Sequence, residues 1–79
     1  MWRSIAPVML MVRNRLAQIL NDKRLTQATL AKRCGIAPET IGRIKQHRRD
    51  PSAEVMLRIA RALGMPVETI FYLDNEAPE

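Results

Sequence analysis

The chain has 79 residues, with 13 Lys and Arg against 8 Asp and Glu, a formal net charge of +5 and 47% hydrophobic residues. This length allows one small domain, and this composition is typical of a folded chain rather than a disordered one. A single cysteine excludes an internal disulfide, and one cysteine with one histidine excludes a structural zinc site, which needs about four nitrogen or sulfur ligands.

The first recognisable segment is an apolar run over residues 5–12, interrupted by Pro7. It is too short to span a bilayer, and no small-residue cleavage site follows it, so we expect a soluble, cytoplasmic protein. Residues 8–12 fit either a strand or the beginning of a helix, because their periodicity does not distinguish the two.

Two helices are expected next. The spacing of Leu16, Ile19 and Leu20 predicts a helix over residues 15–22, with Asn14 as its N-cap. Thr26 is a suitable N-cap for a second helix over residues 27–33.

Three more helices are expected, over residues 38–46, 53–63 and 66–70. Proline opens the first and the last of them, at a position where the missing N–H costs nothing. Ser52 is a suitable N-cap for the middle one, and Gly64 ends it. Five short helices with short joints predict an all-α fold.

The charge is unevenly distributed along the chain. Residues 1–49 hold eleven basic and two acidic residues, whereas residues 50–79 hold two basic and six acidic ones. This asymmetry favours a surface that faces a polyanion, and chance segregation on a solvated surface is the alternative. Nucleic acid is favoured over a membrane, because an interfacial helix would need a bulky apolar face.

Residues 27–44 have the pattern of a helix-turn-helix. Two short helices that cross steeply need a small residue between them, which Ala31 supplies, and a turn residue with positive φ, which Gly35 supplies. The apolar positions between the helices are Leu30, Cys34, Ile36, Ile41 and Ile44. The alternative is an αα-hairpin with no role in DNA binding.

Over residues 11–76 the chain resembles the Cro/repressor-type, XRE-like family of helix-turn-helix regulators. The matching segments are Leu25-Thr26-Gln27, Leu30-Ala31, Cys34-Gly35-Ile36, Thr40-Ile41, Asp50-Pro51-Ser52, Ile59-Ala60-Arg61-Ala62-Leu63-Gly64 and Ile70-Phe71. The resemblance implies a five-helix lambda-repressor-like domain over residues 11–74, between an N-terminal extension (1–10) and an acidic tail (75–79). It also implies a two-stranded antiparallel element that pairs residues 10–13 with residues 71–74.

By the same resemblance, the third helix is the recognition helix and enters the major groove. The base-reading positions it implies are Pro38, Glu39, Thr40 and Arg43. The phosphate-binding positions it implies are Thr26, Gln27, Lys45, Gln46, His47, Arg48 and Arg49. The guanidinium of Arg43 suits guanine O6 and N7, whereas Glu39 could accept from cytosine, orient Arg43, or form an intrahelical ion pair with it. A solvated loop is the alternative for residues 47–49.

Three positions depart from the family pattern. Leu20 and Lys45 stand where many members have a paired Arg and Glu, and Ala37 replaces the usual Ser cap of the recognition helix. Pro38 removes a polar side chain from a base-reading position, which narrows direct readout.

Other chemistry finds little support in the sequence. Cys34 lies in an apolar position and is interpreted as a buried thiol rather than a nucleophile. His47 has no acid or nucleophile near it in the sequence, and there is no glycine-rich phosphate loop. We therefore expect no enzymatic activity, no cofactor and no metal.

The sequence thus predicts a double-stranded DNA-binding transcriptional regulator, a repressor that binds an inverted-repeat operator as a homodimer. Dimerisation is expected because the core is small and because apolar residues near the C-terminus are candidates for exposure. The candidates for the dimer interface are Met65, Val67, Phe71, Tyr72 and Leu73. The alternative is an antitoxin-type module that neutralises a partner protein and autoregulates its operon.

Overall fold

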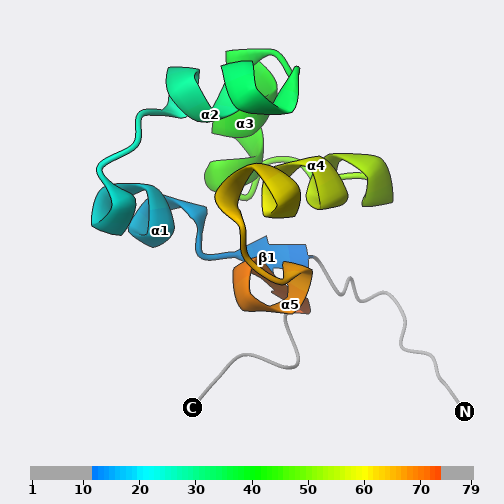
Figure 1. Ribbon diagram of the computed structural model, residues 1–79. Coiled ribbons are helices and arrows are strands. Elements are labelled where there is room, and N and C mark those ends of the chain that lie inside the picture. The colour runs from blue at the N-terminus through cyan, green and yellow to red at the C-terminus, as the bar shows by residue number, and fades with distance from the viewer. Residues whose placement is uncertain (1–11, 74–79) are drawn as a thin grey trace, which may run out of the picture.

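The structure is a computed structural model that describes residues 12–73. The elements are β1 (Val12–Asn14), α1 (Leu16–Lys23), α2 (Gln27–Cys34), α3 (Pro38–Lys45), α4 (Ala53–Leu63), α5 (Val67–Ile70) and β2 (Phe71–Leu73). In Figure 1, α2 and α3 lie together at one end, α5 and the sheet lie at the other, and α4 lies between them. The prediction of five helices with a small antiparallel sheet is confirmed.

The two strands join the beginning and the end of the described chain. Val12 pairs with Leu73, Arg13 with Tyr72, and Asn14 with Phe71, in antiparallel register. The expected antiparallel pairing of these two segments is confirmed, but β1 extends to Asn14, one residue beyond the expected strand, so the register differs by one residue. Val12 belongs to a strand rather than to a helix. Residues 10, 11 and 74 lie outside the described residues, as do the expected extension (1–10) and acidic tail (75–79), so the domain bounds stay predictions.

Side-chain caps and left-handed residues set the helix ends. The Thr26 hydroxyl oxygen accepts from the Thr29 N–H at 3.0 Å, and the Ser52 hydroxyl oxygen accepts from the Val55 N–H at 3.2 Å. After α2, Gly35 has φ +70°, the left-handed conformation that glycine adopts without a Cβ penalty. These three expectations from the sequence are confirmed.

Two helix starts differ by one residue from the sequence prediction. The N-cap of α1 is Arg15, because Asn14 belongs to β1, and α5 begins at Val67 with Pro66 as its N-cap. The Asn14 side chain still serves α1, since its Oδ1 accepts from the Leu16 N–H at 3.0 Å.

Asn14 also connects β1 to the end of α3. Its Nδ2 donates to the Ile44 carbonyl oxygen at 2.7 Å, and the residue is only 8% exposed. Ile44 lies in the last turn of α3, where carbonyl groups have no partner within the helix. The Asn14 amide therefore ties the first strand, the beginning of α1 and the end of α3 together inside the core.

The core draws on all five helices and on β2. Its members are Leu16, Ile19, Leu20, Leu30, Ala31, Cys34, Ile41, Ile44, Ile59, Ala60, Leu63, Ile70 and Phe71. The predicted apolar positions between α2 and α3 are confirmed, with Ile36 half-buried rather than buried. The longest helix in residues 12–73 has 11 residues, and no helix there is long and apolar enough to cross a membrane.

The prediction that Phe71 is exposed is wrong, because it is only 5% exposed. Its neighbour Tyr72 is half-buried, and the Arg15 guanidinium lies 4.4 Å from the centre of the Tyr72 ring. Successive residues of a strand point to opposite faces, so Phe71 faces the core and Tyr72 faces outward beneath Arg15.

We expect Asn14→Ala to lower the free energy of unfolding by about 1–3 kcal/mol. The Leu16 N–H would lose its partner in the interior, and the Ile44 carbonyl would keep only its bond from the His47 N–H. Urea unfolding measures the change, with Gln18→Ala on the exposed side of α1 as the control. Equal stability of the two variants would contradict a structural role for the Asn14 amide.

Candidate nucleic-acid interface

A hydrogen bond joins the first residues of α2 and α3. The Gln27 Nε2 donates to the Pro38 carbonyl oxygen at 2.9 Å. At the start of α3, Ala37 provides no side-chain cap, as the sequence predicts, so the first N–H groups of the helix are not satisfied by a capping side chain. Both helix starts therefore lie close together, and helix N-termini favour anions such as phosphate.

Gly42 makes room for the Gln27 side chain. A Cβ built on Gly42 would lie 2.9 Å from the Gln27 Nε2, closer than two such atoms can approach. Gly42 is not among the residues that the sequence predicts for this site. A glycine inside a short helix costs about 1 kcal/mol of stability relative to alanine. Its presence at such a position is therefore a sequence signal that another group packs closely against the helix there.

The two sides of α3 are distinct. Ile41 and Ile44 are fully buried, whereas Pro38, Glu39 and Arg43 are exposed and Thr40 is half-buried. Within residues 12–73 no ion pair joins Glu39 to Arg43, so the intrahelical pair considered for Glu39 is not formed here. The predicted base-reading side chains are thus brought together on the outward side of one helix.

The residues after α3 have a more defined conformation than a solvated loop. His47 has φ +62°, and its N–H donates to the Ile44 carbonyl oxygen at 2.9 Å, which closes the end of the helix. The His47 ring is half-buried, and its Nδ1 is buried with no hydrogen-bond partner among the described residues. His47 thus follows the Gln46 C-cap and closes the last turn of α3, while its place at the interface stays a prediction.

The remaining predicted phosphate contacts lie at the beginning of α2 and at the end of α3. Thr26 is exposed and its hydroxyl is engaged in capping α2, while Lys45 is half-buried. Gln46, Arg48 and Arg49 are exposed. The predicted phosphate-binding residues thus flank the outward side of α3 at both of its ends.

Cys34 is a buried thiol, as the sequence predicts. It is 5% exposed, and burial raises its pKa, while the positive charge of Arg58 lowers it by a smaller amount. A raised pKa keeps the thiol protonated and poorly nucleophilic at neutral pH. In the described part of the chain, no group of three or more His, Cys, Asp or Glu residues could hold a metal ion.

The candidate dimer residues differ in exposure. Leu73 is 37% exposed, Met65 and Val67 are half-buried and pack against the core, and Phe71 is buried. The most exposed large apolar residue among residues 12–73 is Leu57 of α4, at 59%. Leu57 is not among the residues that the sequence predicts for the dimer interface. Its position outside the apolar stripe of its helix could have indicated one, because an exposed apolar side chain can mark an interaction surface.

Comparisons with known proteins agree with this geometry. Residues 16–70 match the helix-turn-helix family model. An uncharacterized HTH-type transcriptional regulator of Methanocaldococcus jannaschii is 36% identical over 66 residues, which cover 82% of this chain and 100% of that protein. A second one, of Methanothermobacter thermautotrophicus, is 45% identical over 53 residues, covering 66% and 77%. The crystal structure of the restriction-modification controller protein C.AhdI from Aeromonas hydrophila has a TM-score of 0.66 at 28% identity, covering 68% of this chain and 82% of that one.

We expect Gly42→Ala to weaken DNA binding without lowering stability. Alanine favours the helix by about 1 kcal/mol, but its Cβ displaces the Gln27 amide from the Pro38 carbonyl. Thermal unfolding and fluorescence anisotropy with labelled duplex DNA measure the two effects separately. In a Gln27→Ala background, Gly42→Ala should have no further effect on binding, and an undiminished effect there would refute the coupling.

Proposed function

The chain belongs to the XRE-type helix-turn-helix family of transcriptional regulators, and from this premise we propose that it binds an inverted-repeat DNA operator as a homodimer and represses transcription. It is a DNA-binding regulator, and regulators of this family are not enzymes. The observation that best supports the proposal is the placement of α3, which buries Ile41 and Ile44 and turns Arg43 outward.

The first step is docking of α3 in the major groove. Arg43 offers two parallel donors to guanine O6 and N7, a contact worth about 1–3 kcal/mol of discrimination. Thr40 can contact a thymine methyl group, and Glu39 can accept from cytosine N4. Pro38 contributes only apolar contact, so direct readout depends mainly on the other three residues.

Phosphate contacts position the helix on the duplex. The Gln27 amide nitrogen has two hydrogens, of which one is given to Pro38, so the second is available to a phosphate oxygen. Thr26 lies beside it. Lys45, Gln46, His47, Arg48 and Arg49 extend the contacts beyond the other end of α3, where they bind backbone rather than read bases.

The dimer is proposed to form through α4 and the joint between α4 and α5. Leu57 borders an open hollow that is also lined by Ala60, Gly64, Met65, Pro66 and Val67, together with one charged residue, Arg61. In a two-fold dimer the same surface meets itself, so Leu57 of each copy can enter the hollow of the other. Tyr72 and Leu73 line a second hollow, which shares Val67 with the first, and Phe71 supports it from the core. Such a dimer presents two recognition helices to major grooves about 34–36 Å apart.

Selection from randomised duplex DNA tests the proposed operator. The protein is incubated with the duplexes at about 150 mM salt, an ionic strength that weakens binding through phosphates alone, and the retained DNA is sequenced. Recovery of an inverted repeat with half-sites about one helical turn apart is the expected result. Binding that disappears with rising salt, without enrichment of any sequence, would contradict the proposal and favour a protein partner.

Arg43→Ala and Arg48→Ala form a matched pair, because each removes one positive charge. We expect Arg43→Ala to lose sequence preference at one position of each half-site, at a cost of about 1–3 kcal/mol on the specific operator. Arg48→Ala should weaken binding to all sequences alike and reduce the salt slope by about one unit. Titrations over a salt series distinguish the two, and identical behaviour would refute the division of roles.

Leu57→Lys should convert the dimer to a monomer, because the proposed interface would bury a charge without a partner. Analytical ultracentrifugation measures the mass, and circular dichroism checks that the variant is folded. Ala17→Lys, at an exposed position of α1, is the control and should remain dimeric. A Leu57→Lys variant that stays dimeric would place the interface elsewhere.

A further inference from the structure

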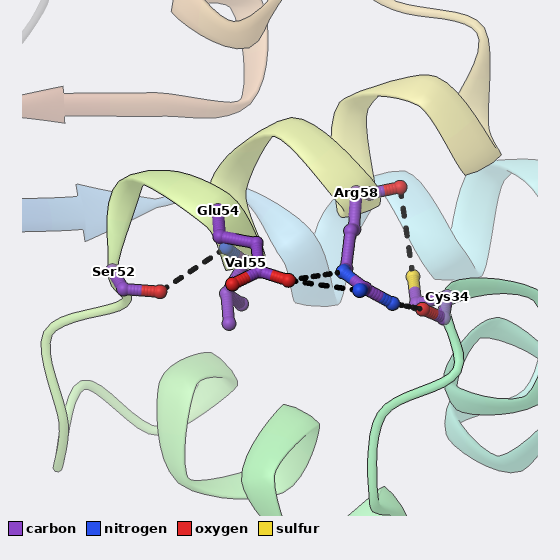
Figure 2. A network of polar contacts seen from close by, with 5 residues as sticks. All are labelled: Cys34, Ser52, Glu54, Val55 and Arg58. Atoms are coloured by element: carbon purple, nitrogen blue, oxygen red, sulfur yellow. Dashed lines mark hydrogen bonds and ion pairs between the residues drawn. The ribbon is translucent and has the colours of Figure 1, made fainter.

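The end of α2 is held by a side chain from another helix. The last carbonyl groups of a helix have no partner within it. Here the Gly35 N–H donates to the Lys32 carbonyl and the Ile36 N–H donates to the Ala31 carbonyl. The Cys34 carbonyl oxygen is served instead by Arg58 of α4, whose Nη1 donates to it at 3.0 Å. Figure 2 shows the Arg58 side chain extending from α4 to this point.

Arg58 is itself held in place by Glu54, one turn earlier in α4. Its Nε donates to the Glu54 Oε2 at 3.0 Å, and its Nη2 lies 2.8 Å from the same oxygen. A weaker contact runs in the opposite direction, from the Cys34 Sγ to the Arg58 carbonyl oxygen at 3.8 Å. The guanidinium thus engages one carboxylate and one helix terminus, and a cation at a helix C-terminus is electrostatically favourable.

The contact lies at the turn between α2 and α3. A Cβ built on Gly35 would be 3.3 Å from the Arg58 Nη1, so the guanidinium packs directly against the residue that reverses the chain. The turn leads within three residues to Pro38 at the beginning of α3. A displacement of the turn relative to α4 would therefore move the beginning of the recognition helix.

We propose that Arg58 is a positioning residue for DNA binding, which fixes the angle between the helix-turn-helix (α2 and α3) and α4. The inference rests on the proposed function, in which α3 reads one half-site and α4 joins the two copies. An angle fixed within each copy then fixes the separation of the two recognition helices. Arg58 in this way sets which half-site spacing the dimer accepts, although it is not itself among the residues proposed to contact DNA.

Arg58→Met, compared with Arg33→Met, tests the inference. Both variants remove one positive charge from the same hollow, which Arg33, Cys34, Arg58, Arg61 and Ala62 line. The Arg33 side chain makes no hydrogen bond or ion pair within residues 12–73, so its replacement leaves the contact intact. Affinities are measured for the selected operator, for operators with one base pair added or removed between half-sites, and for an unrelated duplex.

We expect Arg58→Met to bind the selected operator about tenfold more weakly, a factor comparable to the loss of one base contact. Its affinity for the unrelated duplex should match that of Arg33→Met, and the difference between its affinities for the selected spacing and for the altered spacings should become smaller. Equal operator affinity and equal spacing preference in the two variants would overturn the inference. If the unmodified protein shows no sequence preference, the proposed function fails instead, so the two failures are distinguishable.

A purely stabilising role is separated by two further measurements. Thermal unfolding gives the temperature at which each variant unfolds, and all affinities are measured well below the lowest of these temperatures. Arg58→Lys, which keeps a charge and one donor for the Cys34 carbonyl, should recover most of the spacing preference. If Arg58→Met does not fold, Glu54→Gln weakens the anchor while leaving Arg58 present, and it should likewise reduce the difference in affinity between the selected spacing and the altered spacings. An unchanged preference in Glu54→Gln would overturn the inference in that case.

Discussion

The hydrogen bond from the Asn14 Nδ2 to the Ile44 carbonyl oxygen holds the end of α3, the proposed recognition helix, against the first strand. Its beginning is held by Gln27 through the Pro38 carbonyl, and the preceding turn is held by Arg58 through the Cys34 carbonyl. Each contact gives a partner to a backbone carbonyl in the first or last turn of a helix. Each contact also joins α3, or the turn before it, to a different element, so together these directional bonds favour one placement of α3.

Apolar packing and polar contacts have separate tasks in this domain. Burial of side chains such as Leu30 and Ile59 supplies the stabilising free energy, which depends on area and carries little directional information. Hydrogen bonds contribute less net free energy, but their geometry selects among alternative packings of the same helices. A domain with a small core has few apolar contacts with which to define a helix angle, and three polar side chains supply that definition here.

Local signals were sufficient for most of the fold. Ser52 and Gly64 mark both ends of α4 because capping depends on a few neighbouring residues, and Ala31 and Gly35 mark the helix-turn-helix for similar local reasons. The residues whose burial or role the sequence did not predict depend on partners far away in the chain. Phe71 is buried because β2 turns it toward the core, and Gly42 matters only because Gln27 crosses it. The roles proposed for Gln27 and Arg58 at helix ends likewise depend on contacts that no sequence window contains.

The pairing of Val12 with Leu73 brings the first and last residues of the described domain side by side. Cα partners in an antiparallel pair are about 5 Å apart, so the two ends of this segment are neighbours in space. A short linker could join them, and the chain could be opened instead between Arg49 and Asp50, in the exposed stretch between α3 and α4. We therefore expect a circular permutant, with its termini between α3 and α4, to keep the same arrangement of helices.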